Sequence, residues 1–135
     1  MTDPAGVDAS VLVRYFVQDD PERGPAASRL LDGAELVHIG GVALLETAGT
    51  LESVYRVPRA DIVDALVDLI AKQNVQLLGL DKTVVAGALQ MCRPSRRVSF
   101  GDALINAEAR SHSLRRVYTF DRRFLADGIQ PVSPT

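Results

Sequence analysis

Four carboxylates lie at junctions between apolar segments and helical ones: Asp8, Glu46, Asp102 and Asp121. Each follows or begins an apolar stretch instead of lying in a charged run. If the fold gathers these side chains, a cation has to relieve their mutual repulsion. A hard divalent ion held by oxygen ligands beside a polyanionic substrate is the usual arrangement, so the pattern indicates metal-assisted phosphate chemistry.

Each carboxylate also has a purely structural explanation. Asp8 can cap the helix that follows it, as aspartate does well. Ser99 and Asp102 have the spacing of a capping box, in which the acid folds back on the helix start. Asp121 can cap the next segment, and Glu46 lies opposite an apolar stripe, where a solvated glutamate is the default. Local spacing therefore leaves both readings open.

Two other polar residues could support a metal site. Asn106 follows Asp102 by four residues, shares its helical face and could hydrogen-bond behind the metal ligands. Thr119 lies two residues before Asp121 and would point the same way in an extended segment. The positive end of the helix dipole would in addition favour the ionised form of Asp102.

The elements that must position these residues follow an α/β pattern, in which short apolar runs alternate with longer stretches of helical period. We expect strands near 5–8, 36–39, 75–78, 116–120 and 129–132, and helices over 10–16, 20–31, 44–55, 62–70, 81–91 and 99–111. Asp8 then lies at the carboxyl end of the first strand, where open α/β sheets bind ligands. Without repeats or a long linker, residues 1–135 are expected to form one domain.

Composition excludes several other kinds of site. One cysteine, Cys92, rules out an internal disulfide and a cysteine-rich zinc site, and two histidines make a His/Cys metal centre improbable. At 47% hydrophobic and 24% charged residues, the chain has the composition of a globular protein. We see no apolar stretch long enough for a bilayer and no secretion signal, so we expect no membrane association and a cytoplasmic location.

Charge is unevenly distributed along the chain. The net charge is −2, but residues 1–89 carry 7 basic and 13 acidic side chains, whereas residues 90–135 carry 8 basic and 4 acidic ones. All eight of the latter are arginines, which match phosphate through bidentate hydrogen bonds. A solvated basic surface is the alternative. We expect an RNA-binding rim, with the strongest candidates Arg96, Arg97, Arg115 and Arg116.

Four segments together resemble the PIN-domain ribonucleases, specifically the VapC toxins of bacterial toxin–antitoxin pairs. Residues 7–21 (VDASVLVRYFVQDDP) resemble the family's start, and Leu44-Leu45-Glu46 resembles its second acidic motif. The third motif is similar to residues 100–105 (FGDALI) and the last to residues 119–124 (TFDRRF). Each motif alone is weak, but the four occur in the family's order and spacing along nearly the whole chain.

The resemblance assigns roles to the acids and their neighbours. It implies that Asp8, Glu46 and Asp102 coordinate Mg²⁺ or Mn²⁺ and that Asp121 helps hold the metal or its water shell. Small polar residues, Ser10 and Thr119, fall on positions that shape the site. One departure is that Ala9-Ser10 replaces the commoner Thr-Asn pair, which puts the hydrogen-bonding role of that asparagine in doubt.

From the resemblance we expect a three-layer α/β/α domain with a central, mostly parallel sheet of four or five strands. The expected activity is hydrolysis of RNA phosphodiester bonds by a metal-activated water. The resemblance also implies a homodimer and a VapB-type antitoxin whose tail blocks the acidic cleft. Alternatives are a housekeeping PIN ribonuclease without an antitoxin, a receiver-like Mg²⁺-binding signalling module, and an inactive RNA-binding scaffold. The receiver reading lacks an acidic pair at the first strand and a late lysine, since the last lysine is Lys82.

Overall fold

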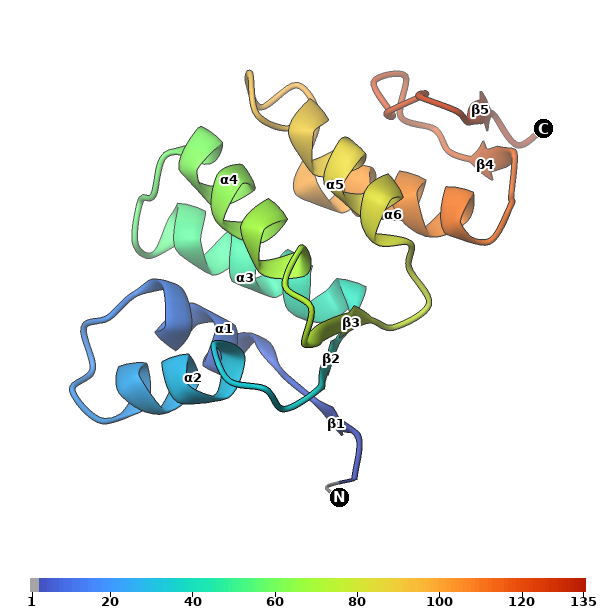
Figure 1. Cartoon of the computed structure of the whole chain (residues 1–135). Coiled ribbons are helices and arrows are strands. Elements are labelled where there is room, and N and C mark those ends of the chain that lie inside the picture. The colour runs from blue at the N-terminus through green and yellow to red at the C-terminus, as the bar shows by residue number, and fades with distance from the viewer. Residues whose placement is uncertain (1–2) are drawn as a thin grey trace.

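The computed structural model describes residues 3–135, in which five short strands alternate with six helices (Figure 1). The strands are β1 (Ala5–Gly6), β2 (Val37–Ile39), β3 (Val75–Leu77), β4 (Arg116–Tyr118) and β5 (Gln130–Val132). The helices are α1 (Ala9–Phe16), α2 (Arg23–Leu31), α3 (Gly41–Ser53), α4 (Arg59–Ile70), α5 (Lys82–Met91) and α6 (Phe100–Ser111). None of the helices over 3–135 is both long and apolar enough to cross a bilayer.

All the strand pairs are parallel, which confirms the α/β class, but the strands do not form one central sheet. Three strands pair in the order β1-β2-β3, and β4 and β5 form a separate sheet of two. The five strands are therefore divided into sheets of three and two, where a single sheet of four or five strands was expected. The physical reason is that α6 carries β4 and β5 away from β1 and fixes them at its own far end (Figure 1).

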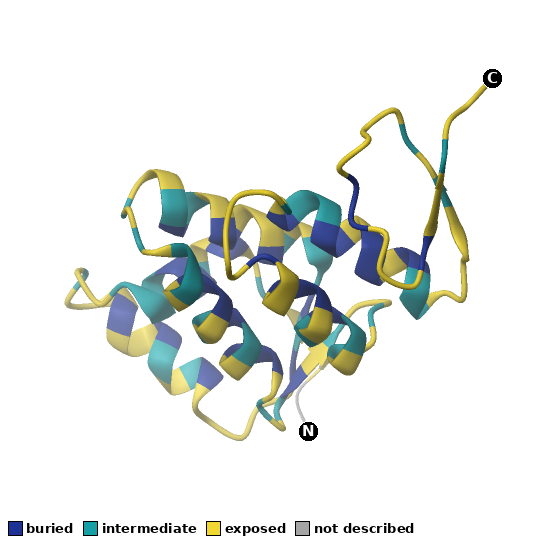
Figure 2. Ribbon diagram, turned by 90° about the horizontal axis from the view of Figure 1, so that it is seen from above, coloured by how far each residue is buried: buried dark blue, intermediate teal, exposed yellow. Residues whose placement is uncertain are grey.

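The main core lies between the three-stranded sheet and the helices above it. Fully buried side chains from α3, α4 and α5, including Leu44, Leu66 and Leu89, pack with Ile39 of β2 and Val75 of β3. These residues fall at the helical spacing that the sequence shows. A second, small cluster of Ala109, Phe124 and Ile129, with Val117 against it, holds β4 and β5 on α6. Figure 2 shows the C-terminal strands standing outside the main body, largely exposed.

Helices α3 and α4 begin at Gly41 and Arg59, three residues before the expected starts, and the start of α2 differs for a local reason. Helix α2 begins at Arg23 and not at Pro21, because the Asp20 carboxylate accepts the backbone N–H groups of Glu22 and Arg23 at 3.0 and 2.8 Å. Asp20 therefore caps a preliminary turn before the helix proper. The other expected elements are present, with the strands shortened by one to two residues.

Hydrogen bonds connect helix α6 both to the segment that follows β3 and to the segment that precedes β5. At its C-terminal end a ring nitrogen of His112 lies 2.7 Å from the Gly79 carbonyl oxygen, and the Ser111 hydroxyl accepts the Asp81 N–H at 2.9 Å. Along its buried face the Asn106 amide donates to the carbonyls of Leu125 and Asp127 at 2.8 and 3.0 Å. The helix thus joins the end of β3 to the β4–β5 unit.

Candidate active site

Asp8 follows β1 and caps the N-terminus of α1. Its Oδ1 accepts the Ser10 hydroxyl at 2.6 Å and the backbone N–H groups of Ser10 and Val11 at 3.0 and 3.4 Å. These bonds, that from the Ser10 hydroxyl first, lower the pKa of Asp8 below its ordinary value. The carboxylate is exposed, so it is a capping group and an ionised, accessible oxygen donor at the same time.

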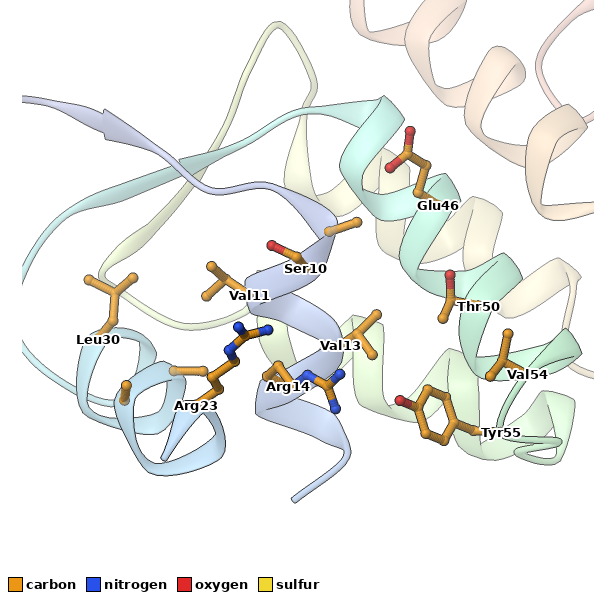
Figure 3. Close-up of a pocket in the computed structure, with 13 residues that line it drawn as sticks. Ser10, Val11, Val13, Arg14, Arg23, Leu30, Glu46, Thr50, Val54 and Tyr55 are labelled. Carbon is orange, nitrogen blue, oxygen red and sulfur yellow. The ribbon is translucent and has the colours of Figure 1, made fainter. Parts of the chain in front are cut away.

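Glu46 lies on α3 and is exposed at the rim of a cavity of about 720 Å³ between α1, α2 and α3 (Figure 3). Ser10 and Thr50 line the same cavity, whose other walls are mainly apolar. The cavity therefore joins the start of α1, beside Asp8, to the face of α3 that carries Glu46. Sequence spacing alone gave no reason to pair these two elements.

Asp102 lies in the first turn of α6 and is partly buried. The Ser99 hydroxyl caps the helix by accepting the Asp102 N–H at 3.0 Å, which is one half of the expected capping box. Burial raises the pKa of Asp102 above its ordinary value, the nearby charge of Asp121 raises it further, and hydrogen bonding of the Asp102 side chain with Ser99 opposes both. A Cβ built on the neighbouring Gly101 would lie 3.9 Å from the Leu45 side chain, so this end of α6 abuts α3 next to Glu46.

Asp121 follows β4 in an exposed turn. The Thr119 hydroxyl accepts the Asp121 N–H at 2.9 Å, and the Asp121 carboxylate accepts the Arg123 N–H at 2.8 Å. Thr119 therefore shapes the turn that presents the carboxylate. Only the influence of Asp121 on the pKa of Asp102 connects this turn to another of the four acids.

The four acids fit a divalent ion in chemistry, but one chain does not gather them. All the donors are carboxylate oxygens, which Mg²⁺ and Mn²⁺ prefer. Burial, and after it the charge of Asp121, raise the pKa of Asp102, so a cation shared by the two carboxylates would relieve this repulsion. Over residues 3–135, however, no three His, Cys, Asp or Glu side chains are placed to hold one metal ion together. A single chain thus contains the four acids without bringing three of them close enough to share one ion.

Comparison with known proteins identifies the family. A model of the PIN domain matches residues 6–127. The chain belongs to the PIN-domain family. One solved structure that matches is VapC20 of Mycobacterium tuberculosis, a sarcin–ricin loop cleaving toxin; the match has 23% identity, covers 98% of this chain and 100% of that chain, and has a TM-score of 0.43. No curated protein matches the chain. With so loose a superposition, the family assignment rests on the sequence.

In this PIN domain Asn106 has a different role from the expected one. It is fully buried, and its amide nitrogen holds the turn of Leu125 and Asp127 instead of the Asp102 carboxylate. Its Oδ1 is buried without a hydrogen-bond partner among residues 3–135. Asn106 therefore fixes the chain segment that follows Asp121, and the expectation that it bonds directly behind the acids is not met.

The arginines proposed for RNA binding lie at two separate places on the PIN domain. Arg96 and Arg97 are exposed in the loop before α6, on the Asp102 side, whereas Arg115 and Arg116 are exposed where β4 begins. The Arg116 guanidinium lies 5.8 Å from the centre of the Tyr118 ring, a cation–π contact. The first pair is well placed beside an acid, while the second lies at the end of β4 remote from Asp121.

Arg59, at the start of α4, is a structural residue that sequence reasoning missed. Its guanidinium donates to the carbonyls of Cys92, Ser95 and Val98, pairs with Glu52 at 3.2 Å and lies over the Phe100 ring. It therefore fixes the arginine-rich loop against the helix bundle. Nothing local marks this arginine, because its three carbonyl partners lie more than thirty residues away in the chain. A hollow of about 660 Å³ beside it is lined by four arginines: Arg56, Arg59, Arg93 and Arg96.

Proposed function

We propose that this PIN domain is a metal-dependent endoribonuclease of the VapC type, the toxin of a toxin–antitoxin pair. The observation that carries the proposal is the charge conflict between Asp102 and Asp121, two carboxylates at element ends in a family-matched chain. Burial, and after it the charge of Asp121, raise the pKa of Asp102. A divalent cation bound between the two carboxylates would lower that pKa again and relieve their repulsion, which supports a metal site at this place.

The residues have distinct roles in this mechanism. Asp8, whose pKa the Ser10 hydroxyl lowers, supplies a charged oxygen donor at the start of α1. Asp102 and Asp121 provide the paired charges, and Glu46 the fourth carboxylate. When bound, Mg²⁺ or Mn²⁺ supplies Lewis acidity and lowers the pKa of a water for in-line attack on phosphorus. No side-chain nucleophile is needed, in keeping with the lack of a Ser–His or Cys–His pattern in the sequence.

The substrate class follows from the arginines. Arg96 and Arg97 beside the start of α6 would neutralise phosphates that flank the scissile bond, with Arg115 and Arg116 as further contacts. Binding should then weaken as salt increases. Single-stranded or looped RNA fits best, since its backbone and bases are accessible.

The partner is proposed to be a VapB-type antitoxin that blocks the acidic site. The cavity between α1, α2 and α3 suits such a partner, because apolar walls lead directly to Glu46 and Ser10 (Figure 3). Arg14 and Arg23 on its rim offer positive charge to an acidic peptide. A homodimer and a cytoplasmic location complete the proposal. A housekeeping PIN ribonuclease without an antitoxin is the second candidate, and a small gene immediately upstream that encodes an antitoxin would decide against it.

The test is inducible expression of wild type, Asp8→Asn and Asp102→Asn in a bacterial host, followed by sequencing of new RNA ends. Wild type should arrest growth and create discrete ends, and both variants should do neither while they remain folded. Asp68→Asn is the matched control, because Asp68 is an exposed acid on α4 outside the proposed site. Cleavage by purified protein that persists in EDTA, or full activity of both variants, would refute the proposal.

A further inference from the structure

Two parallel sheets in this protein each have an open edge. β1 lies at the edge of the order β1-β2-β3, and both of its residues are exposed. β4 and β5 form a two-stranded parallel sheet by themselves, also largely exposed. Parallel sheets are normally covered on both faces, and two strands alone are marginal in water. Each of the two sheets therefore lacks a partner strand at its open edge.

The hydrogen-bonding directions at the two edges are complementary. The Val7 N–H bonds to β2, so by alternation the backbone groups of Gly6 face the open edge of β1. In β4 the Arg115 carbonyl and the Thr119 N–H bond to β5, so the groups of Arg116 and Tyr118 face outward. In a parallel pair with Gly6 opposite Val117, the Gly6 N–H meets the Arg116 carbonyl, and the Tyr118 N–H meets the Gly6 carbonyl.

The chain's own contacts keep these two edges apart. The C-terminal end of α6 is fixed beside the end of β3 through His112 and Gly79, and β3 is the sheet edge opposite β1. The β4–β5 unit is in turn fixed to α6 by Asn106, by the cluster around Phe124 and by the Arg110–Asp127 pair at 3.6 Å. Figure 1 shows the result, with β4 and β5 standing well away from β1.

Aromatic side chains on and after β4 indicate that something covers this strand. Tyr118 is 63% exposed and Phe120 is 82% exposed, although parallel strands with such residues are normally buried. The occupant has to offer a strand edge in parallel orientation. Among residues 3–135 β1, β3 and β5 have free edges, and of these β1 is the strand that leads into an acid of the proposed site, Asp8.

We propose that a second copy of this chain supplies the missing strand: β1 of each copy pairs in parallel with β4 of the other, with Gly6 opposite Val117. The exchange is reciprocal, so it closes as a two-fold dimer. Each copy's three strands then extend to five in the order β3-β2-β1-β4-β5, the last two from its partner. The open edge of β1 and the outer edge of β4 are both used.

The pairing also completes the acidic site, and this part rests on the proposed function. Parallel strands end at the same edge of a sheet, so Asp8, two residues after Gly6, falls beside Thr119 of the second copy. Asp121 follows two residues later. Each centre then takes Asp8 from one chain and Asp121 from the other, which accounts for the incomplete set of acids in a single chain.

Cross-linking tests the pairing without any activity. Ala5→Cys in one tagged chain and Arg116→Cys in a differently tagged chain are opposite each other in this register, and both positions are exposed. Co-expression and mild oxidation should give a disulfide between the two tags, with twice the 14.6 kDa mass. Gln130→Cys in place of Arg116→Cys is the matched control, since Gln130 pairs with Arg116 but lies one strand farther out. Equal cross-linking of the control, no cross-link, or a disulfide within one chain carrying both cysteines would overturn the proposal.

Trans-complementation tests the shared site. Asp8→Asn and Asp121→Asn chains with different tags are co-expressed and purified through both tags, so every dimer has one doubly altered centre and one intact centre. Such dimers should recover about half of the wild-type rate, because one of the two symmetric centres is complete. Active wild type without recovery would overturn the exchange, whereas inactive wild type would refute the nuclease and leave the cross-link as the test of pairing.

Discussion

Asp121 raises the pKa of Asp102, although the two carboxylates belong to different elements, one in the first turn of α6 and the other after β4. The Coulombic effect adds to that of burial, so the folded protein disfavours a charged Asp102 more than the unfolded chain does. A carboxylate whose pKa is higher in the folded protein lowers the free energy of unfolding at neutral pH. Such carboxylates are typical of functional sites, where the charge takes part in binding or catalysis.

Asp102→Asn should stabilise the metal-free protein at neutral pH. A raised folded-state pKa means that the stability is complete below the ordinary value of 3.8 and is partly lost as pH rises through the folded-state pKa. The asparagine variant avoids that loss, so its free energy of unfolding should exceed that of wild type at pH 7 and match it near pH 3. Thermal unfolding at both pH values measures the difference.

The same variant should lose its response to metal. A metal ion that binds only the folded state stabilises it by an amount that grows with the logarithm of its concentration over the dissociation constant, so wild type should gain stability on titration with Mg²⁺ or Mn²⁺ and Asp102→Asn should gain little. Asp68→Asn, altered on an exposed face of α4, should keep the wild-type response. A variant that is less stable than wild type in the absence of metal would contradict this account of the charge conflict.

Ser10→Ala should raise the pKa of Asp8. The Ser10 hydroxyl is the largest cause of the lowered pKa, ahead of the backbone N–H of Val11. A lowered folded-state pKa gives stability that is present above 3.8 and disappears as pH falls through the folded-state value. The variant should lose this stability, and its cleavage activity, at a higher pH than wild type. NMR titration of the carboxyl carbon measures the pKa, and Ser53→Ala, whose hydroxyl bonds to Gly49 within α3, is the control.

Arg59→Ala should destabilise the fold strongly. It removes three hydrogen bonds to loop carbonyls, the pair with Glu52 and the contact with Phe100, which leaves partly buried acceptors unpaired. The loss should be roughly 2–4 kcal/mol in denaturant unfolding. Cys92, a buried thiol whose pKa burial raises to about 11, should react with thiol reagents faster in the variant. Arg93→Ala, which breaks only an exposed pair with Asp64, should cost less than about 1 kcal/mol; similar losses would show that the loop does not depend on Arg59.

The sequence predicted local structure well, because local chemistry determines it. Asp8, Asp81 and Ser99 cap helices where their positions indicate, and buried leucines follow the helical period. Asp20 shows the limit, since an aspartate before proline can cap either a helix or a preliminary turn, and only the backbone geometry decides.

Contacts between residues far apart in the chain could not be predicted from the spacing of residue types. The division of five strands into two sheets depends on where α6 is anchored, through contacts such as that of His112 with Gly79. Asn106 shares a helical face with Asp102, as its spacing predicts, yet its amide bonds to a turn that no periodicity connects with it. The coupling of Asp102 with Asp121 was expected only through the family resemblance.

The open edge of β1 also has a consequence for dosage. If every reactive centre needs two chains, cleavage at low abundance rises with the square of the protein's concentration. A few newly made molecules would then be nearly harmless, while a modest surplus would act abruptly. An inhibitor would need only to keep monomers apart, without ever reaching the acids.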